Sequence, residues 1–488
     1  MRRLCYMVRN HLGRSILSVC RLISHPSEFF SEARQMLEAA RHTNLRKLQA
    51  LFACLCIFSV FSFVLVYYLA YHGCDSHVLV SVTCDWVITS MIKHEMVDLR
   101  IPVSSTAMID CEPLFNRDAG LMGQIKSYMM SNHKRAATPY FYIKATENCQ
   151  IFRKEMGYNG MATLSTQEEK DFPLAFSIMT YKDIEQVERL LRMLYRPQNY
   201  YCIHVDMKSS YTFYRALLGI ASCFSNVFVA SKRVDVAWGE YTVLEGDLVC
   251  MRDLLTYTKW KYIINLTGQE FPLKTNAEMV KILKVFNGAN NLEATVRKRD
   301  MSRINYHYDG IERTTVRKSP PPHNITAVKG SVHILASRGY VDYIINSKIA
   351  NDFLEWVKDT GYPDETFFST MNHNPHLKVP GSYLGEPETN PKIYPFLARY
   401  KLWRYERDSW RCGGYWQRSI CVYGLSDLRH LISRKEFFAN KFELDYEYVA
   451  FDCMEEYIFN LAREHRYRPQ KINISYYENL PFYKNVIL

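Results

Sequence analysis

Residues 174–206 constrain the fold of this chain more than any other segment. Residues 174–180 (LAFSIMT) form a short apolar run of the kind found in a buried strand. Residues 183–195 place apolar side chains at helical spacing, and residues 200–206 (YYCIHVD) form a second apolar run. A strand, a helix and a strand at this spacing predict a βαβ unit, which needs a parallel sheet. The chain is therefore expected to be an α/β protein.

The same alternation continues along the chain. Residues 227–230 predict a third strand, residues 241–257 a further helix, and residues 260–266 a fourth strand. No glycine-rich phosphate loop follows any of these strands. Ligands of open α/β sheets gather at the carboxyl ends of the strands. We therefore expect the rim of a ligand site at residues 180–182, 206–208 and 268–270.

An uncharged run near the N-terminus predicts a membrane anchor. Residues 50–71 carry no charge over 22 positions, which suffices to cross a hydrocarbon core of about 30 Å. Residues 1–47 contain nine Lys or Arg and three acids, so the positive-inside rule places them in the cytosol. A buried core helix is the alternative. We predict a cytosolic basic tail over 1–47, a transmembrane signal-anchor over 48–71 and a type II topology.

The rest of the chain then lies outside the cytosol. Residues 72–148 predict a stem, residues 149–457 a catalytic domain and residues 458–488 a C-terminal extension. Ten cysteines follow the anchor, and an even set in an oxidising compartment indicates a disulfide framework. The sequons at Asn324 and Asn473 are expected to be glycosylated, whereas Asn265 follows an apolar strand and is expected to be buried.

The charge pattern bears on the ligand. The net charge of +11 suits a phosphate-bearing partner, and we expect no nucleic acid. A membrane-anchored α/β enzyme in an oxidising lumen suggests a Golgi glycosyltransferase, and many of these hold a metal with Asp-x-Asp. No two aspartates here are two positions apart, and only residues 245–247 (EGD) and 443–445 (ELD) have a looser spacing. We expect no metal and no other cofactor, so Lys or Arg must neutralise the diphosphate.

Several long stretches resemble one known family. They are FPLAFSIMTYKDIEQVERLLRMLYRPQNYYCIHVDMKS, GIASCFSNVFVASK, WKYIINLTGQEFPLKTN, YPDETFFST, RSICVYG and FANKF, all in order within residues 149–457. They resemble the core 2/I-branching β-1,6-N-acetylglucosaminyltransferases (glycosyltransferase family 14). The resemblance implies a GT-A-like fold with a mostly parallel, helix-flanked central sheet. It also implies a UDP-sugar donor, inversion at the anomeric carbon and no metal requirement.

The resemblance also implies roles for single residues. Glu365 in YPDETFFST matches the catalytic base, and Arg418 and Lys441 match the basic pair on the UDP phosphates. The implied donor-side residues are Met179, Thr180, Tyr181, Asp206, Met207, Lys208 and Trp238. The implied acceptor-side residues are Glu293, Arg303, Trp403 and Tyr405. The implied disulfides are Cys111–Cys453, Cys149–Cys223, Cys202–Cys250 and Cys412–Cys421; Cys74 and Cys84 fall outside this pattern and could pair together or bridge a homodimer.

Each of these residues also has a structural interpretation. Glu365 and Asp364 follow Pro363 and suit the first turn of a helix, where acids favour the macrodipole. Asp206 could cap its strand, and His204 is expected to be packed inside its strand rather than to bind a ligand. Arg418 and Lys441 could be solvated surface charges. Trp403 and Tyr405 could pack in the core or form a platform for a sugar ring.

The sequence thus predicts an inverting, metal-independent transferase in the Golgi membrane. The expected reaction moves N-acetylglucosamine from UDP-GlcNAc in β-1,6 linkage onto a GalNAc or Gal of an O-glycan on a glycoprotein. A different donor (UDP-glucose) or acceptor (I-branching or xylosyl transfer) on the same fold remains open. A non-catalytic glycan-binding protein is the third hypothesis.

Overall fold

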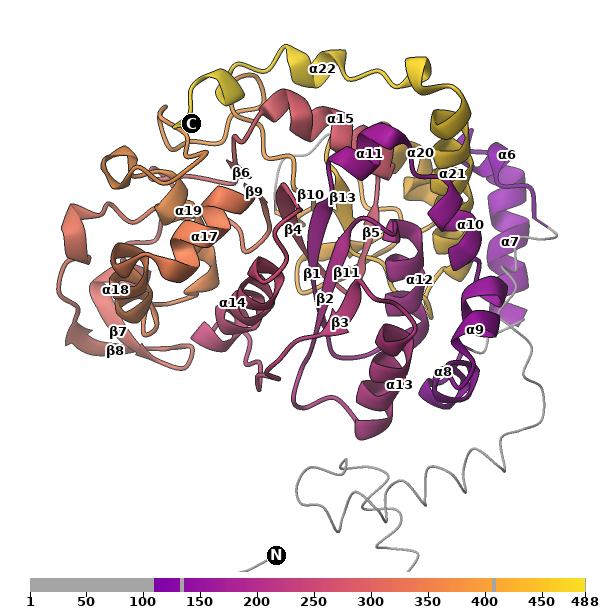
Figure 1. Ribbon diagram of the computed structural model, residues 1–488, viewed down its shortest axis with the longest axis horizontal. Helices are drawn as coiled ribbons and strands as arrows, with labels where there is room; N and C mark the ends of the chain where they lie inside the picture. The colour runs from indigo at the N-terminus through magenta and orange to yellow at the C-terminus, as the bar shows by residue number, and fades with distance from the viewer. Residues whose placement is uncertain (1–108, 132–135, 406–409, 488) are drawn as a thin grey trace, which may run out of the picture. The chain divides into compact units, whose positions relative to one another are not determined.

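The computed structural model describes residues 109–131, 136–405 and 410–487 (Figure 1). The predicted cytosolic tail, the predicted anchor, Cys74 and Cys84 lie outside these residues. Within the described ranges, no helix combines the length and the apolar character needed to cross a bilayer.

A six-stranded sheet in the order β3-β2-β1-β4-β9-β6 forms the centre of the fold. Its strands are β1 (Leu174–Thr180), β2 (Tyr200–Val205), β3 (Val227–Val229), β4 (Tyr262–Thr267), β6 (Asn291–Leu292) and β9 (Ile334–Ser337). Strands β1 to β4 run parallel, whereas β9 is antiparallel to both β4 and β6. The sheet is therefore mixed, but β6 runs in the same direction as β4, so β9 is the one reversed strand of the six and the expectation of a mostly parallel sheet holds.

The antiparallel strand has a consequence for the site. Since β6 runs in the direction of β4 and β9 runs back, residues 293–333 start and finish at the carboxyl edge of the sheet. This excursion contains α16 (Ser302–Asn305) and the hairpin of β7 (Tyr306–Asp309) and β8 (Glu312–Arg317). This excursion brings residues that are distant from β1 in sequence to the edge of the sheet where ligands gather.

Helices cover both faces of the sheet (Figure 1). One core contains side chains of α12 (Ile184–Leu194), α13 (Tyr211–Ser222) and α15 (Asn276–Phe286). The other contains side chains of α14 (Tyr241–Leu255), α17 (Arg338–Asn346), α18 (Lys348–Val357) and α19 (Asp364–Asn372). In β1, Leu174, Phe176 and Ile178 enter the first core and Ala175 the second, as strand alternation requires.

Residues before and after the sheet complete the fold. The helices before it are α6 (Glu112–Phe115), α7 (Ala119–Ser131), α8 (Pro139–Ala145), α9 (Cys149–Glu155), α10 (Tyr158–Thr163) and α11 (Gln167–Asp171). Those near the C-terminus are α20 (Leu428–Ile432), α21 (Tyr448–Tyr467) and α22 (Ser475–Glu478). Leu114 and Tyr142 are fully buried, as is Phe482. The described part of the predicted stem and the predicted C-terminal extension thus both contribute to the cores.

Smaller elements lie beyond the end of β4. A three-stranded sheet pairs β5 (Glu270–Pro272) with β13 (Phe438–Asn440), and β13 with β10 (Arg399–Tyr400). A hairpin joins β11 (Tyr415–Gln417) to β12 (Ile420–Val422). These elements place residues 399–441 next to the carboxyl end of β4.

The four disulfides implied by the resemblance are all present: Cys111–Cys453, Cys149–Cys223, Cys202–Cys250 and Cys412–Cys421.

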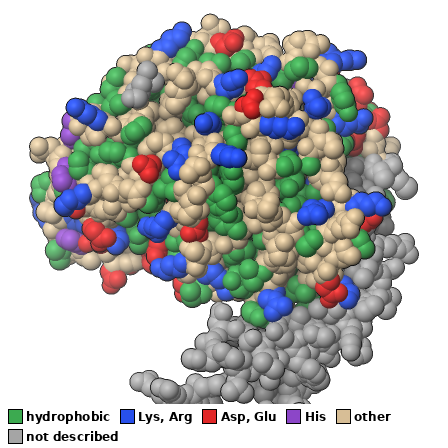
Figure 2. All heavy atoms as spheres, viewed as in Figure 1, with side chains coloured by type: hydrophobic (Ala, Val, Ile, Leu, Met, Phe, Trp, Pro, Cys, Tyr) green, Lys and Arg blue, Asp and Glu red, His purple; other side chains and the backbone are tan. Residues whose placement is uncertain are grey.

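Asn265 is buried and its amide donates to Asp247 at 2.9 Å, which confirms that this sequon is inaccessible. Asn324 and Asn473 are both exposed. On the face seen in Figure 2, basic side chains are interspersed with acidic ones rather than gathered in one broad patch.

Candidate active site

The loop after β2 lies at the carboxyl edge of the sheet. The Asp206 Oδ1 accepts the Lys208 backbone N–H at 2.8 Å, so the carboxylate closes the turn that follows the strand. The Lys208 ammonium reaches Asp235 at 2.5 Å. Arg233 donates to the carbonyls of Asp206 and Met207 at 2.8 and 3.0 Å. These contacts hold the loop in one conformation, and Asp206 is part of that support.

The predicted donor-side residues at the end of β1 differ in exposure. Tyr181 is 54% exposed, whereas Thr180 is buried and donates its hydroxyl to the His204 carbonyl at 3.1 Å. Met179 lies against Gly246 of α14, where any added side chain would meet it. His204 is buried, and burial lowers its pKa to about 4, which confirms the interpretation of a packed strand residue. Of these three residues, only Tyr181, which directly follows β1, has an exposed side chain.

Three cations gather near the end of β13. Lys441 directly follows β13 and donates to the side-chain carbonyl of Gln417. Burial lowers the pKa of Lys441, Glu443 opposes this, and the nearby Arg418 and Lys182 cations lower it further. Arg418 is exposed at the tip of the β11–β12 hairpin. A group of like charges this close suits a multivalent anion such as a diphosphate.

Glu443 anchors this cation cluster (Lys182, Arg418 and Lys441). Its carboxylate accepts hydrogen bonds from Gln417 at 2.8 Å, Gln269 at 2.9 Å and the Tyr415 hydroxyl, and it lies 3.8 Å from Lys182. Despite partial burial, which raises the pKa of Glu443, these hydrogen bonds and the Lys182 charge lower it overall. Glu443 therefore acts as a support for the cations.

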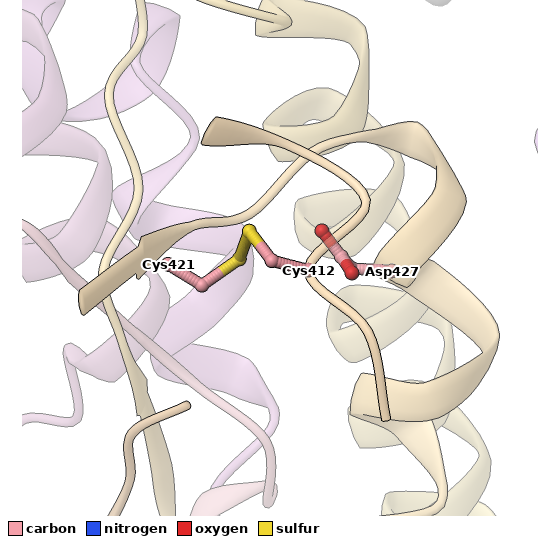
Figure 3. A group of neighbouring side chains, drawn as sticks. All are labelled: Cys412, Cys421 and Asp427. Carbon is pink, nitrogen blue, oxygen red and sulfur yellow. A yellow bond between two sulfur atoms is a disulfide. The ribbon is translucent and has the colours of Figure 1, made fainter. Parts of the chain in front are cut away.

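Another acidic group lies behind the same hairpin. Figure 3 shows Asp427 beside the Cys412–Cys421 disulfide. Sulfurs joined in a disulfide are not thiolate ligands. The Asp427 carboxylate accepts N–H donors from Trp410 at 2.9 Å and from Gly413 at 2.8 Å. The arrangement ties down the base of the hairpin that carries Arg418.

Glu365 occupies the first turn of α19, with its side chain 32% exposed. Arg303 of α16 donates to Glu365 Oε2 at 2.7 Å. The neighbouring Asp364 has a buried Oδ1 that accepts no hydrogen bond from the described residues. Burial and the Glu365 charge raise the pKa of Asp364 to about 7. The two adjacent acids therefore have different environments, and Glu365 is the one held by a cation.

The acceptor-side candidates lie around Glu365. Glu293 directly follows β6, and its Oε1 is 4.0 Å from the Lys329 ammonium. Burial lowers the pKa of Lys401, and the charges of Glu270, Glu293 and Glu365 oppose that shift. Lys401 therefore lies within electrostatic reach of Glu293 and Glu365. No sequence pattern distinguished this lysine.

Residues 401–405 connect the two halves of the site. Trp403 pairs with Ile420 of β12, and the Arg404 N–H donates to the Ser419 carbonyl at 2.9 Å. Trp403 is 36% exposed and Tyr405 is 82% exposed, so neither is a core residue. The segment thus runs from Lys401, near Glu365, to the hairpin tip at Arg418.

Trp238 lies on the loop before α14 and is 62% exposed. Its ring meets that of Tyr362 at 5.3 Å in an edge-on arrangement. The Arg303 guanidinium lies over the same Tyr362 ring, 4.1 Å from its centre. Trp238 is therefore linked to the Glu365 side of the site, and sequence reasoning missed Tyr362.

A buried polar group supports the site from below. The Glu270 carboxylate accepts Asn440 at 2.9 Å and lies 3.0 Å from the Arg399 guanidinium. Burial raises the pKa of Glu270, and the cations around it oppose the change. Asn440 directly precedes Lys441, so this group fixes the backbone that carries one cation of the cluster. No sequence pattern indicates this group, because its members come from distant segments.

The predicted residues therefore fall into three groups along one edge of the fold. The first holds Tyr181, Asp206, Met207 and Lys208. The second is the cation cluster, with Trp403 and Tyr405 on the segment that pairs with its hairpin, and the third contains Glu293, Arg303 and Glu365 together with Trp238. The side chains of Thr180 and Met179 contact the His204 carbonyl and α14 beneath this rim.

Comparison with known proteins bears on this arrangement. The family model described as Core-2/I-Branching enzyme matches residues 174–432. A rat β-1,3-galactosyl-O-glycosyl-glycoprotein β-1,6-N-acetylglucosaminyltransferase 3 is 36% identical over 378 residues, 75% of this chain and 85% of the relative. A zebrafish (Danio rerio) transferase 4 of the same name is 38% identical over 371 residues, 72% of this chain and 83% of the relative. The chain is thus a glycosyltransferase and belongs to the Core-2/I-branching enzyme family.

Proposed function

We propose that this chain transfers N-acetylglucosamine from UDP-GlcNAc to the 6-hydroxyl of a GalNAc or Gal in an O-glycan. The names of its relatives support the sugar and the β-1,6 linkage. The observation that carries the proposal is the position of Glu365. This partly exposed carboxylate is held by Arg303, and residues 401–405 connect its surroundings to the cation cluster.

Glu365 is proposed as the general base. It takes the proton of the acceptor hydroxyl as that oxygen bonds to the anomeric carbon of the donor sugar. The bond from this carbon to the UDP oxygen breaks, and both of its electrons leave with the diphosphate. A single displacement inverts the anomeric carbon and needs no covalent enzyme intermediate.

The cation cluster is proposed to stabilise the leaving diphosphate. Arg418 and Lys441 supply charge-assisted hydrogen bonds where negative charge develops, which is the role that a divalent ion plays in many sugar transferases. Lys182 adds a third positive charge on the same side. With this set of cations the proposed reaction needs no metal.

The remaining proposals concern the setting of the reaction. Asp206, Met207 and Lys208 are proposed to face the uridine, with Tyr181 and Trp238 beside it. Glu293, Trp403 and Tyr405 are proposed to bind the acceptor sugar, with aromatic faces against its C–H face. We also propose a type II anchor in the Golgi membrane through residues 48–71, with the acceptor carried on a glycoprotein.

A donor and acceptor panel with purified chain tests this function. UDP-GlcNAc, UDP-glucose and UDP-xylose are each offered with Galβ1-3GalNAc and with a linear N-acetyllactosamine chain, with and without EDTA. We expect transfer from UDP-GlcNAc to Galβ1-3GalNAc that EDTA does not reduce. Preference for another donor or acceptor would replace the assigned substrates. Glycan binding without turnover in every combination would identify a binding protein.

A further inference from the structure

Tyr362 has an unusual backbone conformation three residues before Glu365. Its φ is +54°, in the left-handed region of backbone conformation that residues other than glycine rarely adopt. It also precedes Pro363, which restricts the preceding residue further. Such a conformation is strained and persists only where surrounding contacts fix it. The contacts of the Tyr362 ring indicate the role of this side chain.

The Tyr362 ring lies between an arginine and a tryptophan. The Arg303 guanidinium carbon is 4.1 Å from the ring centre, and the Trp238 ring is 5.3 Å away and nearly perpendicular. The Gly361 N–H donates to the Arg303 carbonyl at 2.8 Å. Next to Trp238, a Cβ on Gly239 would stand 3.1 Å from the Tyr362 ring, so the two loops meet closely.

Arg303 has a second partner, Glu365, at 2.7 Å. An arginine side chain has several rotatable bonds, and stacking on an aromatic face restricts the plane of its guanidinium. The contacts therefore form a continuous series from Trp238 through Tyr362 and Arg303 to Glu365. Each link in the series is a direct contact between side chains.

We propose that Tyr362 is a positioning residue of the transfer reaction. Its ring fixes the guanidinium of Arg303, which in turn fixes the Glu365 carboxylate, and Trp238, a proposed donor-side residue, fixes the ring. The inference rests on the proposed function, in which Glu365 is the base. Fixing the base is valuable because proton transfer requires the acceptor hydroxyl and the carboxylate at hydrogen-bond distance.

Substitutions at Tyr362 distinguish the effect of its ring on kcat from the effect of its backbone conformation. Tyr362→Leu should lower kcat roughly 3- to 30-fold, as expected from a cation–π contact of about 0.5–2 kcal/mol. Tyr362→Phe keeps the ring and should keep kcat. Tyr362→Gly removes the ring but accepts a positive φ, so it should lose activity without a lower Tm. In all three, UDP affinity by calorimetry should change less than about threefold.

A double-mutant cycle tests whether Tyr362 acts through Arg303. Once Arg303→Met has removed the guanidinium, Tyr362→Leu should cause little further loss of kcat. Arg303→Lys, which keeps the charge but not the planar group, replaces it if Arg303→Met is too slow to measure. The matched control is Tyr306→Leu, because Tyr306 stacks with Arg313 at 4.9 Å on the neighbouring hairpin. The control should leave kcat unchanged.

The outcomes distinguish the two proposals. Additive losses in the cycle, or equal losses in Tyr362→Phe and Tyr362→Leu, with an active wild-type chain would overturn the role of Tyr362 alone. A wild-type chain without any transfer would overturn the proposed function and this inference together. Non-additive losses with rescue by phenylalanine support both.

Discussion

At the scale of single residues, Asp364 and Glu365 show how neighbours in sequence acquire different properties. Glu365 is paired with Arg303, whereas Asp364 has a buried oxygen without a hydrogen-bond partner among the described residues. The sequence places both acids at a helix start and does not distinguish them. The distinction comes from residues 293–333, which return to the sheet edge and bring Arg303 to one acid only.

The raised pKa of Asp364 predicts a pH-dependent stability. This pKa is about 7 in the folded chain and near 3.8 when unfolded, so between these values the folded state binds more protons. Stability from this group falls as pH rises from about 4 to 7 and then levels off. The free energy of unfolding of Asp364→Asn should therefore increase relative to that of the wild type as the pH rises over this range. At pH 8 the difference should be about 1–3 kcal/mol, a value discounted because the Asp364 side chain is partly exposed.

Urea denaturation at several pH values measures this difference. Asp342→Asn, an exposed aspartate on α17, is the control for general charge effects. A stability difference for Asp364→Asn that is flat between pH 4 and 8, or one matched by Asp342→Asn, contradicts the assigned environment.

Lys441 allows a second prediction at this scale. Losing one charge-assisted contact to a diphosphate costs roughly 1.5–3 kcal/mol, so Lys441→Met should weaken UDP binding about 10- to 150-fold. Lys232→Met is a matched control, since Lys232 is an exposed lysine paired with Glu245 at 2.6 Å. Calorimetric titration with UDP measures both, and unchanged affinity in Lys441→Met would remove Lys441 from the donor site.

At the scale of elements, the β11–β12 hairpin presents Arg418. Its two turn residues, Arg418 and Ser419, both have positive φ, as the two-residue turns that match strand twist require. The Cys412–Cys421 disulfide closes the base of the hairpin beside Asp427. The element therefore holds a flexible cationic side chain at a fixed place.

Removing that disulfide should lower UDP affinity more than it lowers the stability of the fold. With Cys412 and Cys421 both changed to Ser, we expect UDP affinity to fall about 3- to 10-fold, because ordering the freed segment costs roughly 0.5–1.5 kcal/mol. The control pair, Cys149→Ser with Cys223→Ser, should lower Tm but keep UDP affinity, since that disulfide joins α9 to the end of α13. Equal effects of the two pairs on UDP affinity would contradict this role.

At the scale of the whole molecule, the sequence predicted the first four strands closely. Residues 174–180, 200–206, 227–230 and 260–266 correspond to β1 (Leu174–Thr180), β2 (Tyr200–Val205), β3 (Val227–Val229) and β4 (Tyr262–Thr267). Buried parallel strands read as continuous apolar runs, which makes them visible. The short β6 and the antiparallel β9 lack such a signal because they depend on pairing with distant chain.

The site was predicted less evenly. Glu365, Arg418 and Lys441 came from short motifs, whereas the supports around them are not local in sequence. Glu443 is held by Gln269 and Tyr415, and Glu270 by Arg399 and Asn440. Tyr362 is the first residue of the YPDETFFST motif, but its role depends on Arg303 and Trp238, which are 59 and 124 residues away in sequence. Periodicity and motif spacing carry no information about such contacts.

The packing of the early helices predicts where the folded unit begins. Leu114 and Tyr142 are fully buried, and Cys111 is bonded to Cys453 of α21. A chain beginning at residue 149 should therefore aggregate or unfold at a much lower Tm than one beginning at residue 109. Size-exclusion chromatography and thermal denaturation compare the two. Equal yield and Tm would show that residues 109–148 are dispensable for folding.

The central claim is that Glu365, and not Asp364, is the base. The measurement is the transfer rate from UDP-GlcNAc to Galβ1-3GalNAc for Glu365→Gln and Asp364→Asn, with UDP binding followed by calorimetry in the same samples. We predict that Glu365→Gln loses about 100-fold or more in kcat, as for removal of a general base, while UDP binding is retained. Asp364→Asn should keep most of its activity. Full activity in Glu365→Gln, or a greater loss in Asp364→Asn, would contradict the account.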